Sequence, residues 1–300
     1  MHICFGLASI FLLGAPLLFA AEAGAEAVMT KKFSVGEAEV WAIADSLRDI
    51  DMDVFPTADP EAVKRYVPTG KAPSSIMVYL VKTGGETVLV DAGLGAPSGD
   101  RASHLLPLLK EIGVSPEDVT LVLITHMHGD HIGGLVKNGQ KEKVFLALAP
   151  STKVLVSRVE RDFWLGDNIS LYPDRKATFD MARRVWDLYE GATGTFEFGD
   201  EVAPGITAVD ASGHTPGHAA FLLESGGERM LFAGDFLHAA ALQLPRPDIN
   251  SSYDMEPEKA AATRERLLKR SAEEKLPLAG SHTPFPGVIT VSDGLPTSKN

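Results

Sequence analysis

An apolar run that ends in a cluster of histidines and an aspartate is the feature that most constrains the fold of this chain. The run VTLVLIT, residues 119–125, is almost wholly apolar, which indicates a strand buried on both faces. The next residues, 126–131, read HMHGDH and hold three of the nine histidines in the chain. A loop at the end of a buried strand can present polar side chains at a sheet edge. We therefore predict a sheet whose edge carries a polar site.

The composition is typical of a soluble globular protein. The chain has 300 residues, of which 45% are hydrophobic and 23% charged, and a chain of this length can bury a large core without disulfides. Its one cysteine, Cys4, excludes an internal disulfide. The net charge of −12 argues against a nucleic-acid partner, because phosphate binding requires a basic surface.

The first residues have the pattern of an export signal. No charged residue occurs in 1–21, the segment is strongly apolar, and small-residue cleavage sites follow it within 21–25. The pattern departs from a typical signal because no lysine or arginine precedes the apolar run. The alternative is an uncleaved membrane anchor, since about 20 apolar residues can span a bilayer. We predict a signal peptide and short N-terminal segment at 1–27, and a periplasmic or secreted mature protein without membrane contact.

Short strands alternate with helices along the rest of the chain, with no break in composition. Strands are expected at 38–46, 75–83, 86–93, 119–125, 205–211, 218–225 and 229–235, and near the end in PLAGSH and GVITV. Helices are expected at 100–112, 175–191 and 256–269. Buried strands need cover on both faces, so the pattern predicts one α/β domain over 28–300, with layered sheets and outer helices.

The spacing within the histidine cluster fits metal binding. His126 and His128 are separated by one residue, so in an extended segment their side chains point the same way. Gly129 then lets the chain turn, and Asp130 and His131 can face a second point. Imidazole and carboxylate groups suit zinc and related first-row ions. One loop therefore offers ligands to two neighbouring ions.

This loop alone does not complete two metal sites, because each ion needs about three protein ligands and a reactive water. Three more candidates follow predicted strands, each beside a glycine: His214 in SGHTPGH, Asp235 in FAGD and His282 in AGSHTPF. His218 begins a strand, and we expect it to support the ligand loop by hydrogen bonding.

The pattern H-x-H-x-D-H at 126–131, followed by His214, Asp235 and His282, resembles the signature of the metallo-β-lactamase superfamily. The resemblance implies an αβ/βα four-layer sandwich with the metals between its two sheets. It implies two ligand triplets, one for each ion: His126, His128 and His214, and Asp130, His131 and His282. It further implies that Asp235 and a hydroxide bridge the ions, and that Asp91 in VDAG supports a ligand.

Longer segments are similar to the methyl parathion hydrolase branch, which is related to the acyl-homoserine lactonases. They are VYLVKTGGETVLVDAG, ITHMHGDHIGGL, RDFWLGD, GHTPGH, GDFLHAAALQLPRPDINSSYD and SHTPFPG, spread over 75–288. Trp164 matches an aromatic side chain that lines the pocket in organophosphate-cleaving members, and Phe163 and Phe179 are further candidates. The segment after DAG, LGAPSGD, has no aromatic residue, which departs from those members.

A second departure concerns the position three residues after the predicted bridging aspartate. Lactonases of the superfamily have a tyrosine there, and this chain has His238. His238 either polarises a substrate carbonyl or donates a proton to the leaving group, or it only orients or lines the pocket.

These features predict an exported dinuclear metal hydrolase that opens lactones or cleaves esters, with organophosphate cleavage as a side activity. The predicted catalytic residues are Asp130, Asp235 and His238. The expected cofactors are two divalent ions, Zn²⁺ first, with iron, manganese or cobalt as alternatives. Loops such as 47–74 and 160–180 are expected to form the walls of a small-molecule pocket.

Other functions use the same scaffold. One alternative is a phosphotriesterase of the methyl parathion hydrolase type, and another is a mononuclear iron oxidoreductase similar to persulfide dioxygenases. A thioesterase of the glyoxalase II type is disfavoured. Such an enzyme is expected to have a basic, helical C-terminal region, whereas the last residues here, PGVITVSDGLPTSKN, are short and strand-like. A homodimer contact is expected in 47–74, through Val54, Phe55 and Tyr66.

Overall fold

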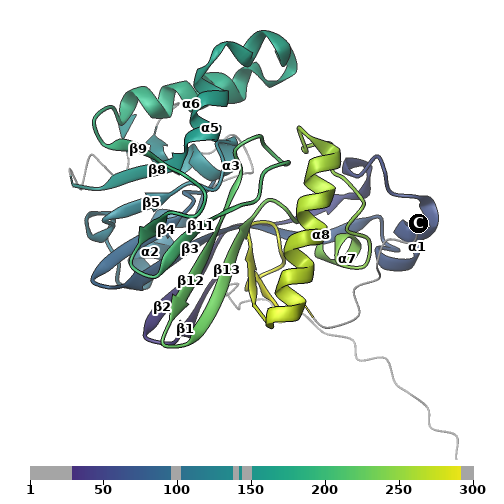
Figure 1. Ribbon diagram of the computed structural model, residues 1–300, viewed down its shortest axis with the longest axis horizontal. Helices are drawn as coiled ribbons and strands as arrows, with labels where there is room; N and C mark the ends of the chain where they lie inside the picture. The colour runs from purple at the N-terminus through teal and green to yellow at the C-terminus, as the bar shows by residue number, and fades with distance from the viewer. Residues whose placement is uncertain (1–28, 96–102, 138–141, 144–150, 292–300) are drawn as a thin grey trace, which may run out of the picture.

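The computed structural model describes residues 29–95, 103–137, 142–143 and 151–291. Two sheets face each other, and the first is seven-stranded with the order β1-β2-β3-β4-β5-β8-β9 (Figure 1). Its strands are β1 (Thr30–Val35), β2 (Ala38–Asp51), β3 (Lys71–Thr83), β4 (Glu86–Val90), β5 (Leu121–Leu123), β8 (Lys153–Ser157) and β9 (Thr193–Phe196). Strands β1 to β4 pair antiparallel, and β4, β5, β8 and β9 pair parallel, so the sheet is mixed.

The second sheet is six-stranded and runs in sequence order from β10 to β15. Its strands are β10 (Glu201–Ala203), β11 (Ile206–Asp210), β12 (Ala219–Ser225), β13 (Glu228–Gly234), β14 (Leu278–Gly280) and β15 (Val288–Ile289). Only β13 and β14 pair parallel, because the long helix α8 (Pro257–Glu274) connects them. The short strands β6 (Val136–Lys137) and β7 (Glu142–Lys143) form a separate pair.

Helices cover the outer faces of both sheets. The first sheet carries α2 (Leu105–Glu111), α5 (Arg158–Leu165) and α6 (Lys176–Leu188), whose apolar side chains pack with those of β3, β4 and β5. Helix α8 packs Leu267 and Leu268 on the second sheet, and a third apolar cluster fills the space between the sheets. The predicted α/β sandwich of two sheets and flanking helices is therefore confirmed.

The predicted strands and helices occur with shifted ends. Helix α6 ends at Leu188, and α8 continues to Glu274, where Lys275 adopts a left-handed conformation with φ 50°. The strand predicted at 119–125 pairs only over Leu121–Leu123, so the chain is already irregular where the polar cluster begins. The prediction of a loop at 47–74 was wrong. The segment contains the end of β2, the helix α1 (Pro60–Tyr66) and the start of β3.

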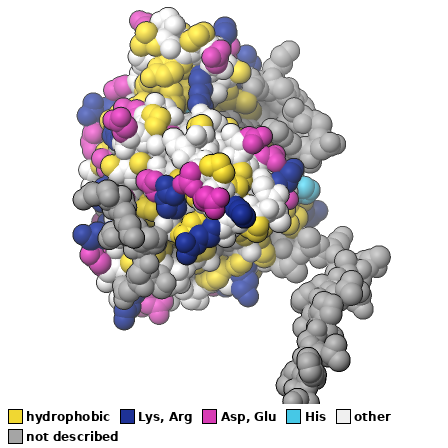
Figure 2. Space-filling view, turned by 90° about the vertical axis from the view of Figure 1, so that its right-hand side faces the viewer, with side chains coloured by type: hydrophobic (Ala, Val, Ile, Leu, Met, Phe, Trp, Pro, Cys, Tyr) yellow, Lys and Arg dark blue, Asp and Glu magenta, His cyan; other side chains and the backbone are white. Residues whose placement is uncertain are grey.

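Two other predictions concern the surface and the termini. Phe55, expected at a dimer contact, is 2% exposed and packs inside the chain against residues such as Leu242. On the face that carries α1 and the short helix α7 (Ala240–Gln243), acidic and basic side chains are interspersed (Figure 2). The predicted signal peptide lies outside the described residues, and none of the helices in the described ranges is long and apolar enough to span a bilayer.

A bulge in β2 changes which side chains face each side of the first sheet. Ala44 pairs with Met77 and Ser46 pairs with Ile76, which leaves Asp45 as an extra residue on β2. Because side chains alternate along a strand, one extra residue reverses the direction of every side chain after it. The second half of β2 therefore presents a different set of residues from the one that simple alternation predicts.

Hydrogen bonds to the buried carboxylate of Asp45 hold this bulge. One oxygen accepts from the backbone amides of His104 and Leu105, each at 2.8 Å, and from the Ser103 hydroxyl at 2.6 Å. The other accepts from the Leu94 amide at 2.8 Å. Asp45 thus connects β2 to the loop after β4 and to the first turn of α2.

We expect Asp45→Ala to destabilise the fold by about 3 kcal/mol, because it leaves several buried donors without an acceptor. The exposed Asp49 on the same strand provides a matched control, Asp49→Ala. Chemical denaturation should give a clearly lower midpoint for Asp45→Ala alone. Equal midpoints for the two variants would contradict the role assigned to Asp45.

Candidate metal centre

Polar side chains from several strand ends meet at one end of the two sheets. The loop after β5 carries His126 and His128, and the short helix α3 (Gly129–Ile132) carries Asp130 and His131. The second sheet brings three residues to the same place: His214 after β11, Asp235 after β13 and His282 after β14. The structure therefore brings together all the residues predicted as ligands.

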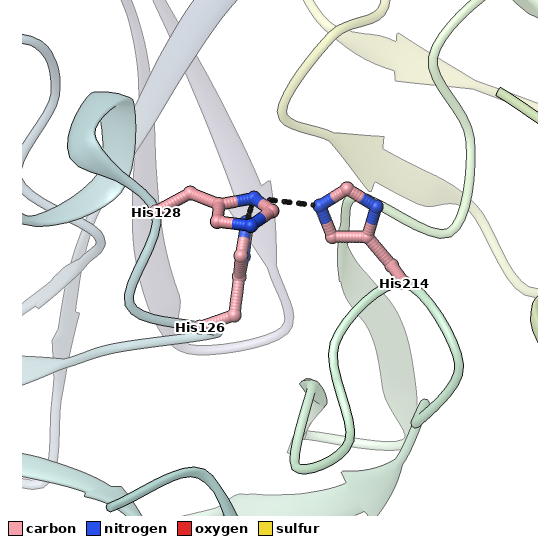
Figure 3. Close-up of side chains that lie close together, drawn as sticks. All are labelled: His126, His128 and His214. Carbon is pink, nitrogen blue, oxygen red and sulfur yellow. Dashed lines mark hydrogen bonds between the residues drawn. The ribbon is translucent and has the colours of Figure 1, made fainter. Parts of the chain in front are cut away.

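The first cluster consists of His126, His128 and His214. The Nδ1 atom of His128 lies 3.0 Å from the Nε2 atom of His126 and 3.0 Å from the Nε2 atom of His214. Figure 3 shows the three rings converging, two from one loop and the third from the loop opposite. One ion could contact all three nitrogen atoms, because they lie within 4.8 Å of one another.

The second cluster consists of Asp130, His131 and His282. The Oδ1 of Asp130 lies 3.8 Å from the Nε2 of His131, and the Oδ2 of Asp130 lies 3.5 Å from the Nε2 of His282. Burial acts to raise the pKa of Asp130, but the two imidazoles outweigh it and lower the pKa to about 2. The carboxylate is therefore ionised at neutral pH, as a ligand for a cation must be.

Asp235 lies between the two clusters. Its Oδ2 is 3.5 Å from the Nε2 of His214 and 3.0 Å from the Nε2 of His282, and its Oδ1 is 3.3 Å from the Nε2 of His131. Burial acts to raise the pKa of this carboxyl, but His131 and His282 outweigh it and hold the pKa well below its usual range. One carboxylate thus reaches both clusters.

Hydrogen bonds on the outer nitrogens determine which ring nitrogens face the centre. The Nδ1 atoms bond outward: His126 to Thr125 Oγ1 at 3.1 Å, His131 to Asp91 Oδ2 at 2.8 Å, His214 to Asp254 Oδ1 at 3.1 Å and His282 to the Ser75 carbonyl at 2.9 Å. Each Nε2 therefore faces the centre, where it can offer a lone pair to a cation. Burial acts to lower the pKa of His131, but Asp235, Asp91 and Asp130 outweigh it and raise the pKa well above its usual range, so this ring would release a proton when a cation binds.

The atoms that face the centre suit a cation. Burial lowers the pKa of His126 and His128 well below the usual range, so both rings are neutral at pH 7. The Nε2 of His131 and the Oδ1 of Asp235 are buried without a hydrogen-bond partner in the described part of the protein. Converging lone pairs and buried carboxylates are unfavourable alone and fit a divalent metal.

Asp254 supports His214 and was not predicted from the sequence. Its Oδ1 accepts from His214, and its Oδ2 lies 3.2 Å from a guanidinium nitrogen of Arg264 and accepts from the Ser251 amide at 3.0 Å. Arg264 is fully buried and also donates to the carbonyls of Phe236 and Pro247. Helix α8 thus fixes the orientation of a candidate metal ligand through two buried charges.

Glu160 on α5 was also missed. One of its oxygens accepts from the Met127 amide at 2.9 Å and from the Trp164 indole at 2.6 Å. The other accepts from the Thr215 hydroxyl at 2.7 Å and from the Gly217 amide at 3.0 Å. A single buried carboxylate therefore connects the loop of His126 and His128 with the loop of His214. No motif marks Glu160 in the sequence.

Other predicted supporting residues lie directly behind the clusters. Asp91, with φ 63°, accepts from His131 and from the amide and hydroxyl of Thr125. His218 bonds to the Ala211 carbonyl at 2.8 Å through Nδ1, and its Nε2 accepts from the amide of Asp235 at 3.0 Å. Both residues therefore contact the ligand-bearing segments rather than the centre itself.

The residues predicted to line the pocket divide into two groups. Trp164 and Phe179 are fully buried, with ring centroids 4.6 Å apart, and Phe163 is half-buried beside them. Their contact with substrate stays a prediction, since Trp164 and Phe179 expose no surface. His238 is also buried, with its Nε2 3.3 Å from Asp235 Oδ2 and its ring stacked on His282.

Two facing sheets with histidine and aspartate clusters at their shared end define a metal-dependent hydrolase. The profile of the Metallo-beta-lactamase superfamily matches residues 72–282, which include every candidate ligand. The chain belongs to this superfamily.

Solved structures cover most of the chain. AidC, a dizinc quorum-quenching lactonase solved in complex with a product, is 26% identical, covers 89% of this chain and 95% of its own, and superposes with a TM-score of 0.78. The hydrolase AbOPH is 28% identical, with 90% and 95% coverage and a TM-score of 0.81.

Curated relatives match over shorter lengths. The lactamase-like protein aptB of Emericella nidulans is 32% identical over 52% of this chain and 38% of its own length. An N-acyl homoserine lactonase of Bacillus sp is 25% identical over 50% of this chain and 58% of its own.

We expect Asp254→Asn to weaken metal binding roughly 10- to 100-fold, because a neutral amide orients and polarises His214 less strongly than a carboxylate. Asp248→Asn makes the same change in a surface ion pair with Arg246 and is the matched control. Titration with zinc against a chelating competitor measures the affinity. An unchanged affinity in Asp254→Asn would contradict this role.

Proposed function

We propose that the protein is an exported, dinuclear metal-dependent hydrolase that opens lactones or cleaves esters. The observation that carries this proposal is the position of Asp235 between two complete ligand triplets. A site for one ion would need neither the second triplet nor a shared carboxylate. The similarity to a dizinc lactonase supports the same number of ions and favours zinc, with iron, manganese or cobalt as alternatives.

The chemistry that such ions supply when bound is a water with a pKa near neutrality and a polarised substrate carbonyl. The residues of the chain would hold the ions and carry a proton from the attacking water to the leaving group. Asp235 keeps the two clusters together. The side chain of Asp130 is 25% exposed, the most accessible carboxylate of the site, and it can pass a proton to the leaving oxygen.

His238 is the proposed donor to the substrate carbonyl. Burial lowers its pKa to about 4, so the ring is neutral at pH 7 and carries one N–H. Neither ring nitrogen has a hydrogen-bond partner within the described ranges, although both are buried. A neutral donor next to the bridging carboxylate suits stabilisation of a developing oxyanion.

Organophosphate cleavage is proposed only as a side activity, together with membership of the methyl parathion hydrolase branch. The burial of Trp164 and Phe179 leaves few aromatic surfaces for an aryl phosphotriester. A mononuclear iron oxidoreductase remains the alternative from another class, and the close approach of His282 to Asp235, 3.0 Å, argues against it. Export to the periplasm or the medium is proposed from the pattern of residues 1–27.

Asp235→Ala should abolish turnover, as should removal of metal by a chelator, because both clusters lose their shared ligand or their ions. The measurement is a panel on zinc-loaded protein with an acyl-homoserine lactone, a simple lactone, an aryl ester, a phosphotriester and a β-lactam. Elemental analysis should give two ions per chain. Full activity in the chelated protein, or cleavage confined to the phosphotriester, would contradict the proposal.

His238→Phe should lower kcat/KM for a lactone about 100-fold, the loss typical of one donor to a developing oxyanion. Phenylalanine keeps a ring that can stack on His282 but removes the N–H. Metal content should stay at the wild-type value, which separates loss of the donor from loss of the site. If the activity is retained, His238 only lines the pocket.

A further inference from the structure

A cavity adjoins the metal centre on the side of β2. Its volume is about 300 Å³, and it is lined by residues 46–51 of β2 together with Val54, Ile76, Leu94 and Tyr253. Two contacts join it to the metal centre. The ring of Tyr253 lies 5.7 Å from that of His238, and the guanidinium of Arg48 lies 3.6 Å from Asp130 Oδ2.

The bulge at Asp45 sets the face of the sheet on which Arg48 lies. After the bulge, Ser46 pairs with Ile76 and Arg48 pairs with Ser74, and residues directly opposite in a sheet share one face. Without the extra residue, Arg48 would point to the opposite face of the sheet. The hydrogen bonds of Asp45 therefore also help to set the face on which Arg48 lies.

The guanidinium of Arg48 has N–H donors without an acceptor in the described part of the chain. It carries five N–H donors, and its side chain is 32% exposed. Its contact with His282 Nδ1, at 3.4 Å, joins two donors, because that nitrogen already donates to the Ser75 carbonyl. In the part of the chain that the structure describes, no other hydrogen bond of this side chain occurs, and the ion pair with Asp130 is longer than a hydrogen bond.

Apart from Ser46, the rest of the cavity wall consists of apolar, aromatic and acidic residues. Leu47 and Tyr253 are 45% and 39% exposed, although large apolar side chains are usually covered. Asp49 and Asp51 also line the cavity and disfavour an anionic group. The cavity is thus suited to a neutral, partly apolar group that brings an acceptor oxygen to Arg48.

We propose that Arg48 determines specificity by donating hydrogen bonds to a neutral carbonyl oxygen on the substrate, next to the scissile group. The N-acyl homoserine lactones named for similar lactonases carry such an acylamino carbonyl, and the new assignment is that Arg48 would bind it, with a short apolar chain beside it. The chain is short because the cavity lies at the lower end of the range for ligand pockets. This inference rests on the proposed lactonase or esterase function.

The test compares two lactones on zinc-loaded wild type and Arg48→Met, which keeps an unbranched side chain without donors. One is a γ-butyrolactone with a hexanoylamino substituent, and the other carries an alkyl substituent without a carbonyl. We expect Arg48→Met to lose about 10-fold or more in kcat/KM for the acylamino lactone, as for loss of a hydrogen bond to a charged group. The alkyl lactone should change less than about 2-fold, and Arg48→Lys should fall between.

Two controls separate recognition from a structural role. Arg65→Met removes the same charge from the exposed surface of α1 and should leave both lactones unchanged. The metal content of Arg48→Met should equal that of wild type. Loss of metal in proportion to activity would mean that Arg48 acts only through Asp130 and His282, and would overturn the proposal, as would an unchanged ratio between the two lactones.

A binding measurement distinguishes failure of this inference from failure of the proposed function. Calorimetry with the non-hydrolysable hexanoylamino γ-lactam should give a Kd about 10-fold weaker for Arg48→Met than for wild type. Equal Kd values would overturn the role of Arg48 whatever the enzyme hydrolyses. A weaker Kd without turnover of any lactone or ester would keep Arg48 as a recognition residue and refute the hydrolase activity proposed.

Discussion

The metal centre depends on one buried carboxylate that is not part of it. Glu160 accepts hydrogen bonds from both loops that carry the first histidine cluster, at Met127 on one side and at Thr215 and Gly217 on the other. The loops belong to different sheets, and loops are ordinarily the most mobile parts of a fold. Burial raises the pKa of Glu160, but its partners are all donors, so the ionised form is the one the site requires. This side chain joins the two sheets at the site, together with the hydrogen bond from the Ala219 amide to the Thr125 carbonyl, 2.9 Å.

The candidate ligands differ in how they are supported. His131 and His214 bond to carboxylates, those of Asp91 and Asp254, whereas His126 bonds to a hydroxyl and His282 to a backbone carbonyl. A carboxylate behind an imidazole raises its basicity and fixes its orientation more strongly than a neutral acceptor. Each cluster thus contains one strongly supported histidine. The two clusters are alike in this respect, which agrees with the proposal that each holds an ion.

The sequence pointed to the residues that converge at the site far better than to their surroundings. Ligands such as His126 and His128 are recognisable because their spacing is local and their residue types are rare. Asp254, Glu160 and Arg48 are ordinary charged residues whose roles arise from contacts between distant segments, so no local pattern marks them. The α/β alternation was readable from hydrophobic periodicity. The continuation of β2 beyond its predicted end could not be read from the sequence. Exposed and charged residues alternate there with few buried ones, so the apolar pattern is weak.

Trp164 and Arg48 illustrate that a resemblance in sequence predicts which residue occupies a position better than it predicts whether that residue is exposed. Trp164 was predicted to line the pocket, but its indole donates to Glu160 and its ring packs on Phe179, so it supports the loops instead of forming an open wall. Arg48 matches no motif, yet the one-residue bulge at Asp45 directs it toward the mouth of the centre. A metal ion would accept few arrangements of its ligands, so the candidate ligands allow little variation. The face on which a strand residue lies is set by strand register, and a single inserted residue is enough to change it.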